Sequence, residues 1–305
     1  MSQPNTKPQL WLALRFPHLP LEVIGHAYNS ATPVIISDKR RVYRLNALAL
    51  AAGVNCDMTL SKAQSLSDAV VFERELEKEH QALQRVAEIC YQFTPYIEWY
   101  NDNSLLLEIS RSLNLFRGVE NLTRRLSTVL IPFSYQYHYG LAHTGKASWL
   151  LSWQYHPISN QDKHAVFLQR LQQTPIDFLF EFPDAVAALK KSGFQTLGDV
   201  VKQLNSAKSS AAISQRFGMN FSQYIQDILG SDIHSQGQLF NKPPDIFKPS
   251  ESFKAHIQFD YPITTTDQLR DPMQQLLESL IDDLQEKQQQ LEKLLQEYEK
   301  RRSEL

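Results

Sequence analysis

Hydrophobic and polar positions fall into blocks along the first half of the chain, and each block predicts one element. Residues 10–16 form an almost entirely apolar run that stops at Pro17, which is typical of a strand buried on both faces of a sheet. Two more apolar runs, 96–100 and 104–109, flank the polar turn 101–103, and this pattern predicts a β-hairpin. We expect the first run and the hairpin to share one sheet.

Helical spacing of apolar residues extends from Glu75 to Phe93, and a second helix is expected from Val119 to Leu130. Residues 135–142 alternate as a strand, and a further helix is expected from Gly145 to Ser152. The order is strand, inserted subdomain, helix, strand, strand, helix, strand. This order predicts an α+β fold with a βαββαβ sheet and helices on one face.

The inserted subdomain carries shorter signals. They predict helices at Leu19–Asn29, at Asn46–Ala52 and from near Thr59, with strands at Pro33–Ser37 and Val42–Leu45. Residues 175–230 contain a series of short helices, which predicts a compact all-helical domain. These are Pro175–Phe180, Pro183–Ser192, Thr196–Lys202, Ser210–Phe217 and Phe221–Leu229.

The last quarter begins with a polar, proline-containing segment, 231–250, which is typical of a linker. Residues 252–260 alternate as one strand. From Thr266 onward, leucines at coiled-coil spacing predict a helix of nearly forty residues. Two interpretations of this helix remain open, a surface that binds another protein and a helix packed on its own domain.

Composition narrows the class of protein. The 305 residues are enough for two or more domains, and the formal net charge of -2 gives no global positive field for nucleic acid. Cys56 and Cys90 have no paired spacing, so we expect reduced thiols and no metal site. Residues 1–8 lack an apolar signal core and no apolar run approaches ~18 residues, which predicts a cytoplasmic protein without a membrane partner.

The run Leu10-Trp11-Leu12-Ala13-Leu14-Arg15-Phe16-Pro17-His18-Leu19-Pro20-Leu21-Glu22 resembles the Y-family DNA polymerases, and more narrowly the ImuB proteins, which are polymerase-like subunits of a bacterial mutagenesis cassette. The strand end Gly140-Leu141-Ala142 and the helical domain support the resemblance, which covers roughly residues 8 to 285. It implies a palm at 8–20 and 77–165, fingers at 21–76, an all-helical thumb at 166–235, a linker at 236–250, and a partial little finger with a long C-terminal helix at 251–305.

Active members of that family hold two divalent metals between an Asp on the first strand and an Asp-Glu pair in the hairpin. Phosphoryl transfer uses two cations ~3.5–4 Å apart, and carboxylates are the ligands that bridge such ions. The family positions match Ala13, Asn103 and Ser104, none of which is charged. The resemblance therefore implies that catalytic residues, bound metal and cofactor are all absent. Asp102 and Glu108 are nearby acids that could support a shifted arrangement.

Other positions of the resemblance also depart from active polymerases. The Tyr and Arg that contact the triphosphate match Ala47 and Leu50, and the aromatic residue that screens the sugar falls near Pro17 or His18. The glycine hairpin of the thumb matches residues 180–182, Phe-Glu-Phe. These differences extend the predicted losses to nucleotide and DNA-backbone contacts.

Two short motifs suggest binding. Thr144-Gly145-Lys146 lacks the upstream half of a P-loop, so we do not expect a nucleotide there. Gln236-Gly237-Gln238-Leu239-Phe240 resembles the peptide with which bacterial polymerases bind the sliding clamp, so Gln236, Leu239 and Phe240 are candidate clamp-binding residues. The alternative is that Leu239 and Phe240 fix the linker to the thumb.

The resemblance implies a non-catalytic adaptor in SOS-induced DNA repair and translesion synthesis. Its expected partners are damaged DNA, bound weakly and salt-sensitively, the sliding clamp, a RecA-like mutasome subunit and an error-prone replicative-type DNA polymerase. One alternative is an active error-prone translesion polymerase. Another is a scaffold that binds only proteins.

Overall fold

The computed structural model describes residues 9–25, 31–162, 164–204, 215–230, 246–249 and 266–282. The chain divides into two compact units, Met1–Lys248 and Pro249–Leu305. The predicted linker motif at 236–240 and the predicted strand at 252–260 lie outside the described residues.

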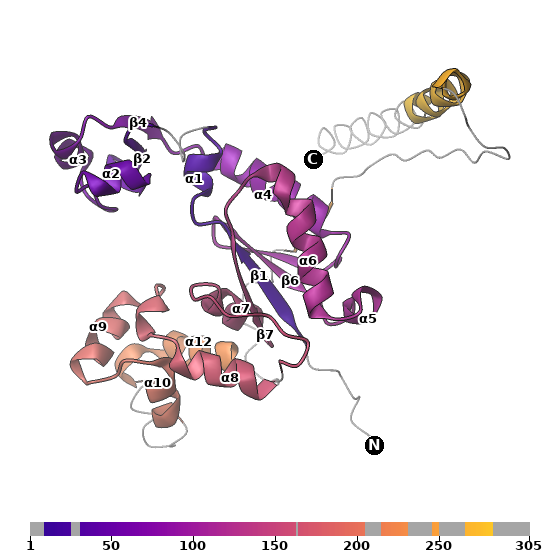
Figure 1. The fold of residues 1–305 in the computed structure, drawn as a ribbon. Helices are drawn as coiled ribbons and strands as arrows, with labels where there is room; N and C mark the ends of the chain where they lie inside the picture. Colours follow the sequence, from indigo (N-terminus) through magenta and orange to yellow (C-terminus); the bar gives the residue numbers. More distant parts are fainter. Residues whose placement is uncertain are drawn as a thin grey trace, which may run out of the picture. The chain divides into compact units, whose positions relative to one another are not determined.

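A four-stranded antiparallel sheet organises the first unit (Figure 1). Its strand order is β5-β6-β1-β7. The strands are β1 (Trp11–Arg15), β5 (Ile97–Tyr100), β6 (Ser104–Glu108) and β7 (His138–Ala142). The first apolar run and the hairpin therefore share one sheet, as the sequence predicts. All five residues of β1 are buried, which confirms a strand covered on both faces.

Helices cover both faces of this sheet, not one face as the sequence predicts. Helices α4 (Leu76–Cys90) and α6 (Val119–Leu130) pack on the face that carries Leu12 and Leu105. Helix α7 (Gly145–Leu151) packs on the opposite face, against Ala13 (Figure 1). Two short helices, α5 (Leu113–Phe116) and η1 (Ile131–Phe133), flank α6.

The inserted subdomain is a second, three-stranded sheet with order β3-β2-β4. Its elements are α1 (Leu19–Glu22), β2 (Val34–Asp38), β3 (Arg41–Leu45), α2 (Ala47–Ala51), α3 (Leu60–Leu66) and β4 (Val70–Glu73). The expected helix from Leu19 is short, because α1 ends at Glu22, and β4 is a strand that the sequence analysis missed. Asn46 caps α2, since its side chain accepts a hydrogen bond from the Ala49 N–H at 3.0 Å.

The helical region contains one helix that was not predicted, α8 (His164–Gln173). It is followed by η2 (Ile176–Phe178), α9 (Pro183–Lys191), α10 (Leu197–Leu204) and α12 (Met219–Leu229). The helix expected at Pro175–Phe180 is thus only the 3₁₀ turn η2. Ala147, Leu150 and Leu151 of α7 belong to the core of this region, so α7 packs against the central sheet with one side and against the helical region with the other.

Residues 246 and 247, near the end of the predicted linker, contact the central sheet. Ile246 pairs with Glu98 on the outer strand β5, and the Phe247 N–H donates to the Ile97 carbonyl at 2.8 Å. The Phe247 ring is 4% exposed and packs against Trp99. In the second unit, η3 (Thr266–Leu269) is followed by helical residues 270–282. Within the described ranges, no helix has the length and apolar character needed to cross a membrane.

Candidate functional site

Ala13 lies at the centre of β1, opposite Leu106 on β6 and Gly140 on β7. Its side chain is fully buried in a cluster that includes Leu106 and Trp149. Helix α7 can approach this face because Gly140 has no side chain, since a Cβ there would lie 2.1 Å from the Ser148 carbonyl oxygen. Apolar packing therefore occupies the place where the resemblance puts a metal-binding carboxylate in active polymerases.

Trp149 also covers Ser104, another of the positions that match metal-binding residues in active polymerases. Its indole Nε1 donates a hydrogen bond to the Ser104 hydroxyl oxygen at 3.1 Å, and that hydroxyl donates to the Asn103 side-chain oxygen at 3.0 Å. Ser104 is fully buried, and Asn103 is half-buried at the hairpin turn. Ala13 and Ser104 thus lie on one face of the sheet, in contact with one indole ring, with Asn103 beside them.

Asp102 is the first nearby carboxylate that could act in place of these residues. Its side chain is 65% exposed and forms an ion pair with Arg74 at 3.0 Å. Arg74 is also held by two hydrogen bonds to the buried Glu79 carboxylate, at 2.9 and 2.7 Å. The Asp102 carboxylate is therefore engaged with a fixed cation at the surface.

Glu108 is the second nearby carboxylate, and it lies at the other end of β6. It pairs with Trp11 and is separated from Ser104 by four residues, about 13 Å along a strand. Its Oε1 accepts hydrogen bonds from the Ser110 N–H, at 3.0 Å, and from the Ser110 hydroxyl. Within the part of the chain that the structure describes, no three His, Cys, Asp or Glu side chains are grouped closely enough to hold a metal ion.

The same face carries a buried cation that sequence reasoning did not single out. The Arg15 guanidinium donates to the Ser152 hydroxyl at 3.2 Å and to the Ser152 carbonyl at 3.1 Å, and it lies 3.9 Å from the centroid of the Trp153 ring. Burial, followed by the positive charge of Arg44, lowers the pKa of Arg15 to about 10. A divalent cation at this end of the face would be repelled by Arg15.

Arg44 and two histidines surround this end of β1. Arg44 Nε donates to the Pro17 carbonyl at 3.3 Å, and His138 pairs with Arg15 across β1 and β7. Burial lowers the pKa of His18, and the charges of His138, Arg44 and Arg15 lower it further. Burial, followed by the charge of Arg15, also lowers the pKa of His138, so the two arginines carry the positive charge at this end of β1.

The segment at 180–182 meets the central sheet through its side chains. The Tyr100 hydroxyl donates to the Glu181 carboxylate at 3.0 Å, and burial raises the pKa of Tyr100, with smaller effects of Tyr224 and Glu181 in the same direction. Phe180 is 48% exposed, and its ring centroid is 4.5 Å from that of Trp153. An acid and two large rings therefore lie where the resemblance puts a phosphate contact.

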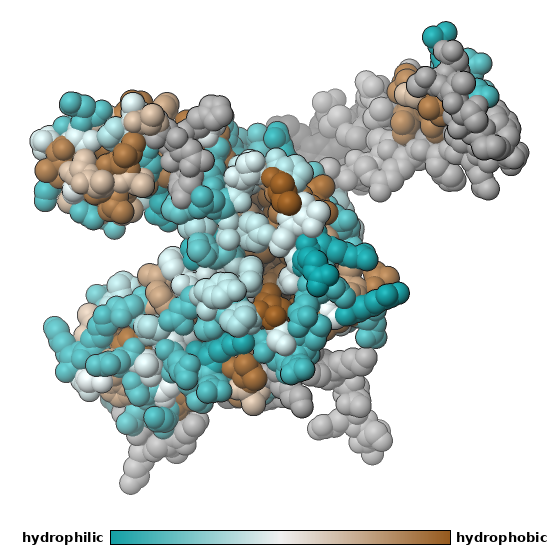
Figure 2. All heavy atoms as spheres, viewed as in Figure 1, coloured by the Kyte–Doolittle hydropathy of each residue, from teal (hydrophilic) through white to brown (hydrophobic). Residues whose placement is uncertain are grey.

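The matched nucleotide positions lie on α2 at the surface. Ala47 is exposed and Leu50 is 57% exposed, and neither side chain has a charge or a hydrogen-bonding group for a triphosphate. Leu48 is 43% exposed, and Figure 2 shows apolar residues gathered over α2. This helix presents an apolar surface.

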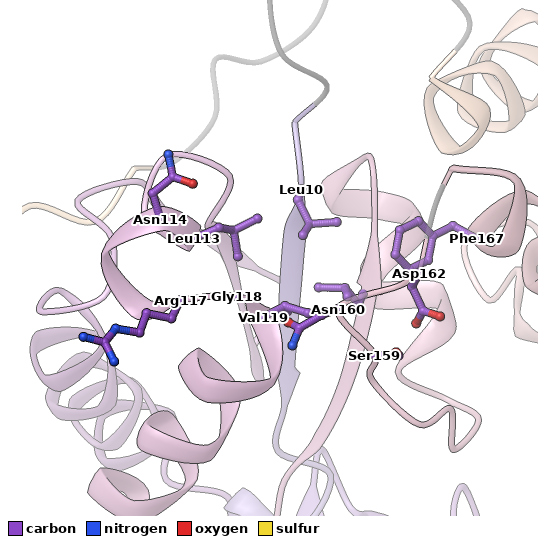
Figure 3. A pocket seen from close by; sticks show the side chains of 11 residues that line it. Leu10, Leu113, Asn114, Arg117, Gly118, Val119, Ser159, Asn160, Asp162 and Phe167 are labelled. Atoms are coloured by element: carbon purple, nitrogen blue, oxygen red, sulfur yellow. The ribbon is translucent and has the colours of Figure 1, made fainter.

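A pocket of about 460 Å³ lies at the opposite end of β1 from Arg15 (Figure 3). Its lining includes Leu10, Leu113, Asn160 and Phe167. The one acidic residue in its lining, Asp162, is paired with Arg170 at 2.9 Å. Sequence reasoning missed this pocket because its walls come from segments far apart in the chain.

The other residues that the sequence analysis considered either have ordinary structural contacts or lie outside the described residues. Lys146 forms an ion pair with Asp227 of α12 at 2.6 Å, so its ammonium has a structural partner. His143 Nδ1 lies 2.6 Å from the Gln9 carbonyl oxygen. Cys56 and Cys90 are free thiols. The clamp-binding candidates Gln236, Leu239 and Phe240 lie outside the described residues.

Comparison with known proteins identifies the fold. A family model described as the impB/mucB/samB family matches residues 24–152. No curated protein matches the chain. The solved structures that match include a ternary complex of Dbh, with a TM-score of 0.58 and 17% identity over 72% of this chain and 66% of that chain.

A second match is DinB from Sulfolobus solfataricus, with a TM-score of 0.58 and 17% identity over 77% of this chain and 68% of that chain. A third is a Y-family DNA polymerase chimera built on Dbh, with a TM-score of 0.58 and 16% identity. The chain thus spans about two thirds of the length of these polymerases. It has the fold of the Y-family DNA polymerases, and residues 24–152 match the impB/mucB/samB family model.

Proposed function

We propose that this chain belongs to the Y family and is a non-catalytic, ImuB-like adaptor that acts at damaged DNA. The observation that supports the proposal is the burial of Ala13 and Ser104 beneath Trp149. A two-metal centre needs carboxylates at these positions and space for two hydrated ions and a triphosphate. Ala13 and Ser104 supply no carboxylate, and the packed indole of Trp149 leaves no space for the ions and the triphosphate.

The alternative is an active translesion polymerase that uses Asp102 or Glu108. The polymerase fold and the presence of two carboxylates on the hairpin favour it. Against it, Asp102 is paired with Arg74, while Glu108 accepts hydrogen bonds from Ser110 about 13 Å along the strand from Ser104. A third possibility, a scaffold that binds only proteins, is tested by DNA binding at low salt.

Primer extension on a primed template, with magnesium and separately with manganese, distinguishes an adaptor from an enzyme. The expected result is no template-dependent nucleotide addition with either ion. Asp102→Asn and Glu108→Gln serve as matched variants, because each removes one charge at nearly constant volume. Addition by the natural chain that either variant abolishes would establish the polymerase and reject the adaptor.

The partners of the adaptor are proposed from the family resemblance. They are the sliding clamp, a RecA-like mutasome subunit and an error-prone replicative-type polymerase, in an SOS-induced repair complex in the cytoplasm. The clamp contact is assigned to Gln236, Leu239 and Phe240, because two adjacent apolar anchors after a glutamine suit a pocket on a partner. Replacing Leu239 and Phe240 with Ala should abolish clamp binding in a direct titration, and an unchanged affinity would exclude this contact.

A further inference from the structure

A second hollow, of about 480 Å³, lies where the end of α5 meets helix α6. Figure 2 shows strongly hydrophilic residues gathered over these two helices. Three arginines line the hollow, and none of the described residues in its lining is acidic. We call Arg117, Arg124 and Arg125 the arginine cluster. The full lining is Leu115, Phe116, Asn121 and the arginine cluster.

The backbone brings the arginine cluster to one side of α6. Arg117 ends α5 in a left-handed conformation, with φ 58°, and the Asn121 side chain on the first turn of α6 donates to its carbonyl at 3.4 Å. Arg124 and Arg125 follow Asn121 by three and four residues, so all three lie on the same side of the helix. Figure 3 shows the Arg117 side chain pointing away from the neighbouring pocket at Leu10.

The charges of the arginine cluster are not neutralised by the fold. All three arginines are exposed, and none of the ion pairs between described residues includes one of them. Arg125 has an aromatic neighbour, since its guanidinium lies 5.7 Å from the centroid of the Phe116 ring. The nearest acid in sequence, Glu120, accepts a hydrogen bond from the Asn160 N–H at 2.9 Å. Three like charges around one hollow repel each other, and a bound anion would offset that repulsion.

Leu115 adds an apolar side chain to the same hollow, and it is 77% exposed. We propose that the hollow is a docking site for an acidic peptide segment of a partner protein, with carboxylates on the arginine cluster and one apolar side chain against Leu115. The planar guanidinium of arginine fits a carboxylate through two parallel hydrogen bonds. Arginines beside an apolar anchor are typical of protein interfaces. A nucleic-acid backbone would use the cations and leave Leu115 without an apolar partner, so the leucine favours a peptide.

This inference goes beyond the proposed function, because it concerns neither the covered face of the sheet nor the segment 236–240. Fluorescence anisotropy of a labelled synthetic peptide, a run of glutamates with one central leucine, measures binding to the full chain at low salt. Arg124→Gln should weaken binding about threefold, and adding Arg125→Gln should weaken it about tenfold, as expected for exposed ion pairs. Added salt should weaken binding to the natural chain. Lys62→Gln, which removes one exposed charge from α3, should leave the affinity unchanged.

A second peptide, with serine in place of its leucine, tests the apolar part of the contact. It should bind the natural chain less tightly, whereas Leu115→Ser should bind both peptides equally. The proposal fails if the leucine peptide does not bind the natural chain, if the double arginine variant binds it normally, or if the natural chain binds both peptides equally. A DNA duplex whose affinity falls in the double arginine variant would assign the arginine cluster to nucleic acid and also reject the proposal. None of these failures would bear on the primer-extension result.

Discussion

Introducing a carboxylate at Ala13 should destabilise the fold in a pH-dependent way. Ala13 has no exposed surface and packs with Trp11, Leu106 and Trp149. Extra atoms in a closed cluster of this kind typically cost about 1–3 kcal/mol. The carboxylate of Ala13→Asp would also lack hydration, and the nearby Arg15 guanidinium is already bonded to Ser152. Burial should therefore raise the pKa of the new carboxyl well above about 3.9.

The direction of the pH effect follows from this raised pKa. Between the unfolded and folded pKa values, the folded chain keeps a proton that the unfolded chain releases, so stability falls as pH rises. The slope is about 1.4 kcal/mol per pH unit. From pH 5 to pH 7, Ala13→Asp should lose about 2.5 kcal/mol more unfolding free energy than the neutral variant Ala13→Asn.

Urea unfolding followed by tryptophan fluorescence measures this difference, with Ala13→Asn as the control for added volume. Equal stability of the two variants at pH 5 and pH 7 would refute the reasoning. It would mean that the carboxylate is solvated, as in an open catalytic cleft, and that Trp149 does not close this face.

Three more predictions concern contacts around the sheet. Phe247→Ala should lower the free energy of unfolding by about 3 kcal/mol, because the ring fills a site beside Trp99. It should also speed amide hydrogen exchange at residue 247. An unchanged exchange rate would show that the ring does not anchor this segment. Burial raises the pKa of Glu22 to about 7, so its contribution to stability falls as pH rises from about 4.3 through 7, and Glu22→Gln should flatten the pH dependence of the urea midpoint over that range. A urea midpoint that varies with pH in Glu22→Gln as it does in the natural chain would contradict this. A double-mutant cycle of Trp149→Phe and Ser104→Ala should give a coupling of about 1 kcal/mol from the lost hydrogen bond, and additive effects would contradict the contact.

Local sequence patterns are sufficient to predict much of the fold. The helix predicted at Val119–Leu130 has those bounds in the structure, because Leu122, Leu126 and Leu130 repeat at helical spacing on a buried face. The hairpin that contains Asn103 and Ser104 was also predicted, since its pairing depends on one short turn. Strand β4 was missed because only four residues form it, and its parallel partner β2 is far away in sequence.

The packing of Trp149 over the candidate site could not be predicted from local sequence patterns. The sequence identifies Ala13 and Ser104 as neutral, but Trp149 is 45 residues from Ser104, and its apolar neighbours in α7 fit an ordinary core helix equally well. The placement of α7 over the sheet depends on the close approach at Gly140, which is a tertiary contact. Arg15 was overlooked for a related reason, because a single charge in an apolar strand does not reveal its partner.

Primer extension by the full chain is the measurement that tests the central claim most directly. We expect no template-dependent addition of nucleotides with magnesium or manganese, under conditions where the protein is folded. Addition that depends on the template and disappears in Asp102→Asn or Glu108→Gln would contradict it, because a working metal centre would then exist on the hairpin.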